Sequence, residues 1–293
     1  MHPVAEQGFN KSATECSYDK ARPSYSVQVI NSILAAPQSN GPLRIVELGA
    51  GTGIATRLLL EHGGAHGGIE RLEAFDPSEG MLQCLRASLF GKNGKEGEVD
   101  RLKQQGKLKQ DAVVVVGEAT FEDYNATPGA DIVIIAQAWH WAPDFDKALR
   151  RIAATLRTGG VLALMWNLED RSAAKWVADF RDLYERYEAG ATQYRHMLWK
   201  KMEETPSYQK YYQPLPPVHI QRALPTTEQD AIDRVMSKSY ISILSDEHKQ
   251  LLTDKMRQIL EGPDTATGRK WIDKLRGKFE YPYKTDLHMY RRT

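Results

Sequence analysis

The 293-residue chain is long enough to bury a substantial core, and 41% of its side chains are hydrophobic. Its 39 lysines and arginines nearly cancel its 38 aspartates and glutamates, which leaves a formal net charge of +1 and no general field to draw in nucleic acid or an anionic membrane. This balance favours a protein that handles small molecules, with no nucleic-acid or membrane partner.

The N-terminal segment and the cysteine content indicate the compartment. The chain does not begin with a basic region followed by an apolar one, and no run of 18 apolar residues occurs in it. Its two cysteines, Cys16 and Cys84, match no paired metal-ligand spacing and are too few for a disulfide framework. We therefore expect a cytoplasmic protein in a reducing environment, without a bound metal.

Residues 43–167 alternate short apolar runs with helical patterns. Continuous hydrophobicity without polar alternation is typical of strands that are covered on both faces, as in a parallel sheet. We interpret five runs as strands: 43–48, 72–76, 112–119, 130–138 and 161–167. Helices are expected between them, over 54–62, 78–90 and 144–157. The repetition predicts right-handed crossovers and an α/β fold with a doubly wound sheet.

Two glycine-rich stretches of this region are expected at the surface. Residues 91–110 are mixed in charge and poor in side chains that could pack, which favours a solvated insertion over a basic binding arm. Residues 61–70 are typical of a helix end followed by a flexible turn. We assign neither stretch a function.

After Asn167 the pattern becomes mostly helical. Trp176, Phe180, Leu183 and Tyr187 recur at helical spacing, so they form an apolar stripe that packs onto the sheet, caps a ligand pocket, or does both. Beyond a proline-rich break we expect strands at 218–224 and 281–292, which bring the sheet to seven, and helices over 226–238 and 246–261. We expect one domain of four segments: an N-terminal helical segment over the site (1–42), a ligand-binding core (43–167), a helical cap (168–213) and the remaining strands and helices (214–293).

Three glycines join the first predicted strand to the first predicted helix, in the stretch LRIVELGAGTGIATRLL (43–59). Gly49, Gly51 and Gly53 occupy every second position after the strand ends at Leu48. Without side chains there, a ligand can approach the backbone N–H groups and the helix N-terminus. An ordinary glycine-rich turn gives the same pattern, so a ligand site requires a second feature.

Asp76, at the end of the second predicted strand, supplies that feature. In nucleotide-binding doubly wound folds an acidic residue at this position accepts hydrogen bonds from ribose hydroxyls, which implies an adenosine ligand. The glycines follow G-x-G-x-G, whereas the dinucleotide fingerprint is G-x-G-x-x-G. An NAD-dependent oxidoreductase is therefore the less favoured alternative.

At these residues the sequence resembles the class I S-adenosylmethionine-dependent methyltransferases. VELGAGTG matches the first motif of that family, FDPSEGML looks like its acidic motif after the second strand, and GEATFED resembles the segment that borders the adenine. YDKARPSY, AQAWHW, RVMSKSYI and YKTDLHMYRR make the chain similar to the small-molecule branch that includes trans-aconitate methyltransferase. The resemblance is best over 18–167, and it implies a Rossmann-like methyltransferase fold with S-adenosyl-L-methionine as the cofactor.

The resemblance also implies positions for the parts of the cofactor. Asp76 would hold both ribose hydroxyls, and Gln137 would lie beneath the sulfonium. Tyr18 and Arg22 lie in the segment that folds over the cofactor in the family, and the Arg22 guanidinium can clamp a carboxylate of the cofactor or of an acidic substrate, unless it is a surface arginine in a frayed terminus. Residues implied around the methionine are Glu47, Gly49, Ala50, Gly51 and Gly53, and those implied around the adenine are Pro77, Met81, Glu118 and Ala119.

The acceptor side rests on fewer residues. Methyl transfer is an in-line displacement that depends on alignment and on exclusion of water. His140 follows the fourth strand and is the candidate base for a hydroxyl, amine or thiol acceptor, unless it only holds a loop; a carboxylic acid needs no base. Tyr25, Trp139, Trp141 and Trp166 are candidate substrate-binding residues, and the tryptophans are equally typical of core.

The prediction that follows is an enzyme that O-methylates a carboxylate or hydroxyl of a small metabolite. N-, S- or C-methylation, and a non-methylating enzyme or regulator on the same scaffold, stay open as alternatives. A nucleic-acid methyltransferase is less favoured, because the sequence has neither an N/D-P-P-Y/F motif nor a basic stripe. We expect a monomer or a homodimer.

Overall fold

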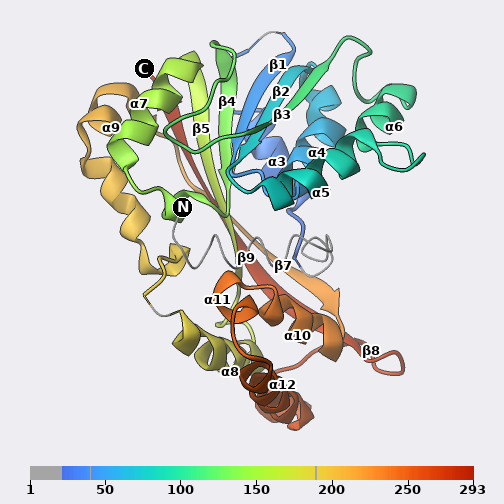
Figure 1. The fold of residues 1–293 in the computed structure, drawn as a ribbon. Helices are drawn as coiled ribbons and strands as arrows, with labels where there is room; N and C mark the ends of the chain where they lie inside the picture. The colour runs from blue at the N-terminus through green and yellow to red at the C-terminus, as the bar shows by residue number, and fades with distance from the viewer. Residues whose placement is uncertain (1–21, 40, 189) are drawn as a thin grey trace.

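The computed structural model describes residues 22–39, 41–188 and 190–293. Within them, nine strands form one sheet (Figure 1). The strands are β1 (Leu43–Leu48), β2 (Ile69–Asp76), β3 (Val113–Glu118), β4 (Ala130–Ala136), β5 (Leu156–Glu169), β6 (Tyr212–Pro214), β7 (Val218–Thr226), β8 (Trp271–Asp273) and β9 (Lys278–Arg292). The longer helices are α3 (Val27–Leu34), α4 (Ile54–His62), α5 (Glu79–Phe90), α6 (Glu98–Gln104), α7 (Phe145–Thr155), α8 (Lys175–Tyr184), α9 (Pro206–Tyr211), α10 (Glu228–Met236) and α12 (Asp246–Glu261).

The sheet confirms the predicted α/β architecture. Its strands follow the order β3-β2-β1-β4-β5-β9-β6, with β1 to β5 parallel and β9 antiparallel to β5. The expected seven strands become nine, because β6 and β8, each only three residues long, also pair with β9. Strands that short carry no periodicity that the sequence could reveal.

Helices cover both faces of the parallel part, which explains its continuous apolar runs. Ile132 and Ile134 of β4 pack towards α3, α4 and α5, whereas Val133 and Ile135 pack towards α7 on the opposite face. Figure 1 shows α7 and α9 on one side of the sheet and α3, α4 and α5 on the other. All four isoleucine and valine side chains are buried, as a two-sided sheet requires.

A second lobe, the C-terminal lobe, is built on the extended end of β9. Phe279, Tyr281 and Tyr283 of that strand form a separate apolar cluster with α8, α10 and α12. Trp176 and Phe180 of the predicted stripe are completely buried in this cluster. The stripe therefore packs against β9, and Figure 1 shows α8, α10 and α12 below the main sheet.

The structure corrects one expectation about local structure and moves the boundary of another element. Residues 91–110 do contain side chains that pack, because α6 buries Val99 and Leu102 and the following turn buries Leu108. The helix expected over 144–157 ends at Thr155, since Leu156 already pairs with Ala130 as the start of β5. None of the described helices has both the length and the apolar character needed to cross a bilayer.

Candidate functional site

The three glycines form a turn between β1 and α4 that other residues would strain. Their φ angles are +70°, +57° and +87° for Gly49, Gly51 and Gly53. A Cβ on Gly49 would lie 2.7 Å from the Cβ of Ala138, and one on Gly53 would lie 2.3 Å from Leu85 Cδ1, so both glycines serve close packing. A Cβ on Gly51 would meet no atom within 4 Å. Gly51 therefore borders open space that a ligand can fill.

Asp76 lies directly beside this turn. Its Oδ2 accepts a hydrogen bond from the N–H of Gly51 at 2.9 Å, and its Oδ1 accepts one from the N–H of Ser78 at 2.9 Å. Burial raises the pKa of Asp76 to about 6, and the two backbone donors oppose that rise. Each oxygen keeps a further lone pair, so the carboxylate can still accept hydrogen bonds from a ligand.

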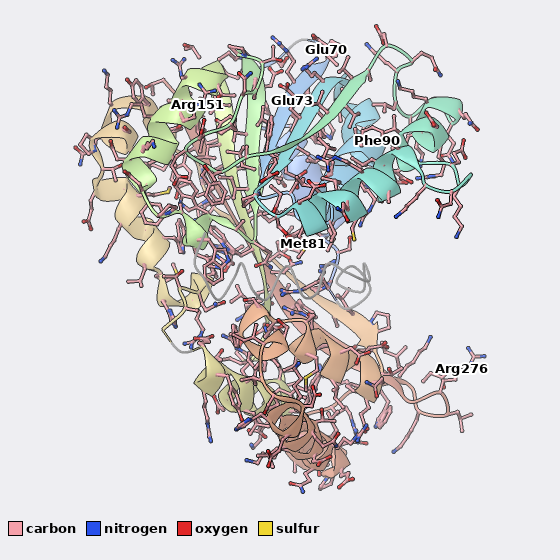
Figure 2. All side chains as sticks on the ribbon, viewed as in Figure 1. Glu70, Glu73, Met81, Phe90, Arg151 and Arg276 are labelled. Carbon is pink, nitrogen blue, oxygen red and sulfur yellow. The ribbon has the colours of Figure 1, made fainter. Side chains whose placement is uncertain are left out.

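A cleft, which we name the glycine cleft, opens over this edge of the sheet. Figure 2 shows Met81, one of its lining residues, near the end of α5 that faces the C-terminal lobe. Phe121 and Trp141 also line it. The cleft brings together seven of the predicted cofactor residues: Gly49, Gly51, Asp76, Pro77, Met81, Ala119 and Gln137.

Most of the remaining predicted cofactor residues line an adjoining space, the side pocket. It is lined by Arg22, Tyr25, Glu47 and Ala50, and it shares Gly49, Gly51 and Gln137 with the glycine cleft. Two predicted residues line neither space: Gly53 begins α4, and Glu118 is exposed at the end of β3. Tyr18 lies outside the described residues.

Glu47 is a second carboxylate with a raised pKa at this edge. It is 1% exposed, and the hydroxyl of Thr56 donates to its Oε2 at 2.6 Å. Burial is the main reason that the pKa of Glu47 rises to about 7, and the charge of nearby Asp76 adds to the rise. A buried carboxylate without a compensating charge does not stabilise the fold. Carboxylates with raised pKa values are therefore typical of functional sites.

A third space, the polar pocket, lies between the sheet edge and the C-terminal lobe. It shares Gln137 and Trp141 with the glycine cleft, and it shares Arg22 and Arg234 with the side pocket. Its cationic residues are Arg22, Arg181, Arg195, Arg234 and Lys238, and its carboxylates are Glu169, Glu185 and Glu188. Even without Arg22, the four remaining cationic side chains outnumber the three carboxylates among the described lining residues, so this lining carries an excess of positive charge.

The excess lies at the inner end, where two cations share one carboxylate. Glu169 Oε1 pairs with Arg234 at 2.8 Å and with Lys238 Nζ at 3.1 Å. Burial alone would raise the pKa of Glu169, but the two cations outweigh burial and hold it well below its usual range. Burial lowers the pKa of Lys238 to about 7, with the charge of Arg234 acting in the same direction. Arg234 is 4% exposed, and its Nε has no hydrogen-bond partner in the described part of the chain.

The outer end of the pocket is balanced. Arg181 pairs with Glu185 at 2.7 Å, and Arg195 pairs with Glu188. Each guanidinium there has its own carboxylate, so this end adds no net charge.

Gln137 lies where all three spaces meet. Its φ is +61°, an uncommon value for a residue other than glycine. Its Nε2 donates to the carbonyl oxygen of Asn167 at 2.8 Å, which joins the ends of β4 and β5. Backbone strain held by surrounding structure is common at ligand sites.

The three predicted tryptophans divide between core and pocket. Trp139 is completely buried among Phe121, Phe145 and Met202, so the expectation of a pocket wall is wrong for it. Trp166 is also completely buried, stacked on Tyr194, and contacts the site through His140. Trp141 alone of the three lines the glycine cleft and the polar pocket.

His140 lines the polar pocket and is 9% exposed. Its Nδ1 accepts a hydrogen bond from Trp166 Nε1 at 3.2 Å. Burial, with a smaller contribution from His196, lowers the pKa of His140 to about 3, so its ring is neutral at physiological pH.

The charged residues of the C-terminal half were missed from the sequence. Arg234 and Lys238 lie in RVMSKSYI, a phrase that matched the resembled branch, yet no role was assigned to either residue. Arg234 lies on α10 and Lys238 lies just beyond the end of that helix, so no periodicity of a single helix marked them as a pair. Glu169, the last residue of β5, offered no comparable signal.

Comparisons with known proteins agree with this geometry. A model of the methyltransferase domain matches residues 18–203. An uncharacterised methyltransferase of Mycobacterium tuberculosis is 29% identical over 249 residues, which are 83% of this chain and 82% of that protein. A trans-aconitate 2-methyltransferase of Rhodopseudomonas palustris is 27% identical over 191 residues, 64% of this chain and 61% of the relative. A solved candidate type II methyltransferase from Anaeromyxobacter dehalogenans has a TM-score of 0.58 at 18% identity, over 92% of this chain and 96% of that one.

Proposed function

The chain belongs to the methyltransferase domain family and uses S-adenosyl-L-methionine as its cofactor, and from this premise we propose that it O-methylates a small organic acid. When bound, the cofactor supplies a methyl group on a sulfonium. The acceptor oxygen forms the new C–O bond while the C–S bond breaks and the sulfur keeps the electron pair. A carboxylate acceptor brings its own negative charge to this step.

The glycine cleft and the side pocket fit the cofactor. Gly51 borders open space, and the Asp76 carboxylate has free lone pairs beside it for ribose hydroxyls. Glu47 and Arg22 line the side pocket, where an ammonium and a carboxylate of the methionine part would find opposite charges. In this arrangement Gln137, which borders all three spaces, would lie beside the reacting methyl group.

The excess of cations in the polar pocket carries the assignment of an acidic acceptor. Arg234 and Lys238 share the single carboxylate of Glu169. Buried charge of one sign is costly unless an opposite charge compensates it. A carboxylate of the acceptor would supply that compensating negative charge. The guanidinium of Arg234 would also orient this carboxylate.

Methylation of a panel of acids tests this function directly. The purified protein is incubated with S-adenosyl-L-methionine and small carboxylic acids, beginning with trans-aconitate because a relative is named for it. Mass spectrometry then detects the gain of a methyl group, and mild alkali separates esters from ethers. The matched control for each acid is its neutral amide.

We expect methylation of one or more acids and none of the corresponding amides. Lys238→Met, at a residue that lines the polar pocket but neither the glycine cleft nor the side pocket, should raise the KM of the acid at least tenfold while S-adenosylhomocysteine still binds. Methylation of the amides at the same rate as the acids would contradict the proposal.

A further inference from the structure

The orientation of His140 is fixed from behind by Trp166. The indole nitrogen of Trp166 can only donate a hydrogen bond, and it donates to Nδ1 of His140 at 3.2 Å. Nδ1 must therefore present a lone pair. In a neutral imidazole the proton then resides on Nε2.

The surroundings keep this tautomer in place. Trp166 is completely buried, with its ring stacked on Tyr194 at 4.5 Å between centroids, so the indole has no room to turn away. The hydroxyl of Thr192 donates to the His140 carbonyl at 2.8 Å and holds the backbone. Burial keeps the ring neutral by lowering its pKa, as described above.

The opposite ring nitrogen belongs to the polar pocket. His140 lines that pocket, and its Nε2 has no hydrogen-bond partner among residues 22–39, 41–188 and 190–293. The two nitrogens of an imidazole point in nearly opposite directions, so a nitrogen held at the core side leaves the other facing the pocket. Trp141, whose ring lies 4.9 Å from that of His140, shares this wall.

We infer that His140 serves the methyl acceptor as a fixed hydrogen-bond donor through Nε2–H, and that Trp166 is the positioning residue that sets the tautomer. This inference rests on the proposed function for the identity of the acceptor. His140 accepts no proton in the reaction, which corrects the role of base expected from the sequence. In this role the Nε2–H of His140 donates a hydrogen bond to one oxygen of the acceptor carboxylate and holds it in place. The other carboxylate oxygen then faces the methyl group.

A base at this position would need a lone pair on Nε2. Moving the proton to Nδ1 would leave the buried Trp166 N–H opposed to another donor. If Nε2 then took up a second proton, the ring would become a buried cation near His196, which is unfavourable because burial and His196 both oppose the charged form. A hydroxyl acceptor would therefore find no proton acceptor in His140.

The tautomer is measured first, because that measurement does not depend on the acceptor. Nitrogen NMR of the cofactor-free, full-length protein labelled with 15N-histidine reports which ring nitrogen carries the proton, and His140→Gln assigns the signal. We expect an unprotonated Nδ1 and a protonated Nε2 from pH 5 to pH 9. A protonated Nδ1, or a cationic ring near neutral pH, would overturn the inference whatever the enzyme methylates.

Kinetics then test the donor role, with the acid that the panel identifies and both substrates saturating. His140→Gln keeps an amide donor, His140→Ala has none, and His140→Glu has an acceptor in its place. We expect Gln to retain roughly a tenth or more of kcat, Ala and Glu to fall at least 100-fold, and wild-type kcat to stay level from pH 5.5 to pH 8.5. Equal losses in Gln and Ala, or a wild-type kcat that falls in acid with a single ionisation, would refute the donor role.

The two proposals fail in different ways. A panel without any methylated acid contradicts the proposed function, whereas the NMR result stands unchanged. If acids are methylated and Nδ1 proves protonated, the proposed function holds and the inference about His140 fails.

Discussion

Replacing Glu47 with Gln should stabilise the cofactor-free protein above neutral pH. Glu47 is 1% exposed, and its ionised form is opposed mainly by burial, which raises its pKa from 4.5 to about 7. An acid whose folded pKa is raised binds its proton more tightly when folded, so its contribution to stability is lost as pH rises from 4.5 to 7 and stays lost above that. Gln removes the charge and can keep the hydrogen bond with Thr56.

The size of the effect follows from the shift. The rise in the pKa of Glu47 from 4.5 to about 7, at about 1.36 kcal/mol for each pKa unit, corresponds to roughly 3 kcal/mol of stability lost by pH 8. For a chain of this size, each kcal/mol moves Tm by about 2 °C. We expect Glu47→Gln to melt roughly 6 °C above wild type at pH 8 and within about 1 °C of it at pH 4.5.

Scanning calorimetry of the cofactor-free protein at both pH values makes the measurement. Glu73→Gln is the matched control, since Glu73 is 4% exposed but accepts from the Thr127 N–H at 2.9 Å and pairs with Arg71 at 3.1 Å. It should melt below wild type at both pH values. A difference between Glu47→Gln and wild type that is the same at pH 4.5 and pH 8 would refute the reasoning, because no ionisation would then be involved.

Three further substitutions test the glycine cleft and the pairing of Glu169 with Arg234 and Lys238. Asp76→Ala should weaken binding of S-adenosylhomocysteine by about 10- to 150-fold in a calorimetric titration, because a hydrogen bond to a charged acceptor contributes about 1.5–3 kcal/mol; unchanged affinity would remove Asp76 from the site. Gly51→Ala should lower that affinity at least tenfold while lowering Tm by only a few degrees, because its Cβ meets no protein atom and the strain at φ +57° costs about 1–2 kcal/mol; equal binding would show that the ligand does not approach there. Glu169→Gln should cost about 3–5 kcal/mol in urea unfolding, because it leaves Arg234 and Lys238 buried without their shared carboxylate, and a cost under about 1 kcal/mol would contradict this account.

The glycine turn and Asp76 could be predicted from the sequence, because the features that form this part of the site are local in the chain. Gly49, Gly51 and Gly53 need positive φ angles within one turn, and Asp76 ends the strand that lies beside β1, so sequence order already brings these residues together. The register pairs Leu48 with Phe75, which places Asp76 one residue beyond the end of β1. Periodicity and turn chemistry were sufficient to predict both elements.

The polar pocket could not be predicted in this way, because it depends on the packing of two lobes. Lys238 reaches Glu169 across 69 residues of sequence, and that contact depends on how far β5 and β9 extend beyond the main sheet. His140 shows the same limit: the sequence places it at the sheet edge, but only the position of Trp166 decides which nitrogen faces the pocket. Side-chain roles that depend on a distant partner leave no periodic signal.

Opposite pH dependences should separate the two halves of the site. The cofactor side is expected to bind best when Asp76 and Glu47 are ionised, so kcat/KM for the cofactor should rise as pH passes from about 6 to about 7. The acceptor side needs a charged Lys238, whose lowered pKa is about 7, so kcat/KM for the acid should fall as pH rises above 7. Lys238→Arg keeps its charge at every accessible pH and should abolish that fall while the rise for the cofactor persists.

Initial rates measured from pH 5.5 to pH 8.5, with each substrate limiting in turn, give the two profiles. One ionisation shared by both profiles would point to a single catalytic base and contradict a site whose pH dependence comes from binding. If kcat/KM for the cofactor rises with pH and kcat/KM for the acid falls, two different groups titrate. This result would assign one group to the glycine cleft and the other to the polar pocket, which meet at Gln137. Under the proposed function, the methyl-transfer step would then require only alignment and charge, because a carboxylate acceptor is already ionised and the Nδ1 lone pair of His140 accepts a hydrogen bond from Trp166.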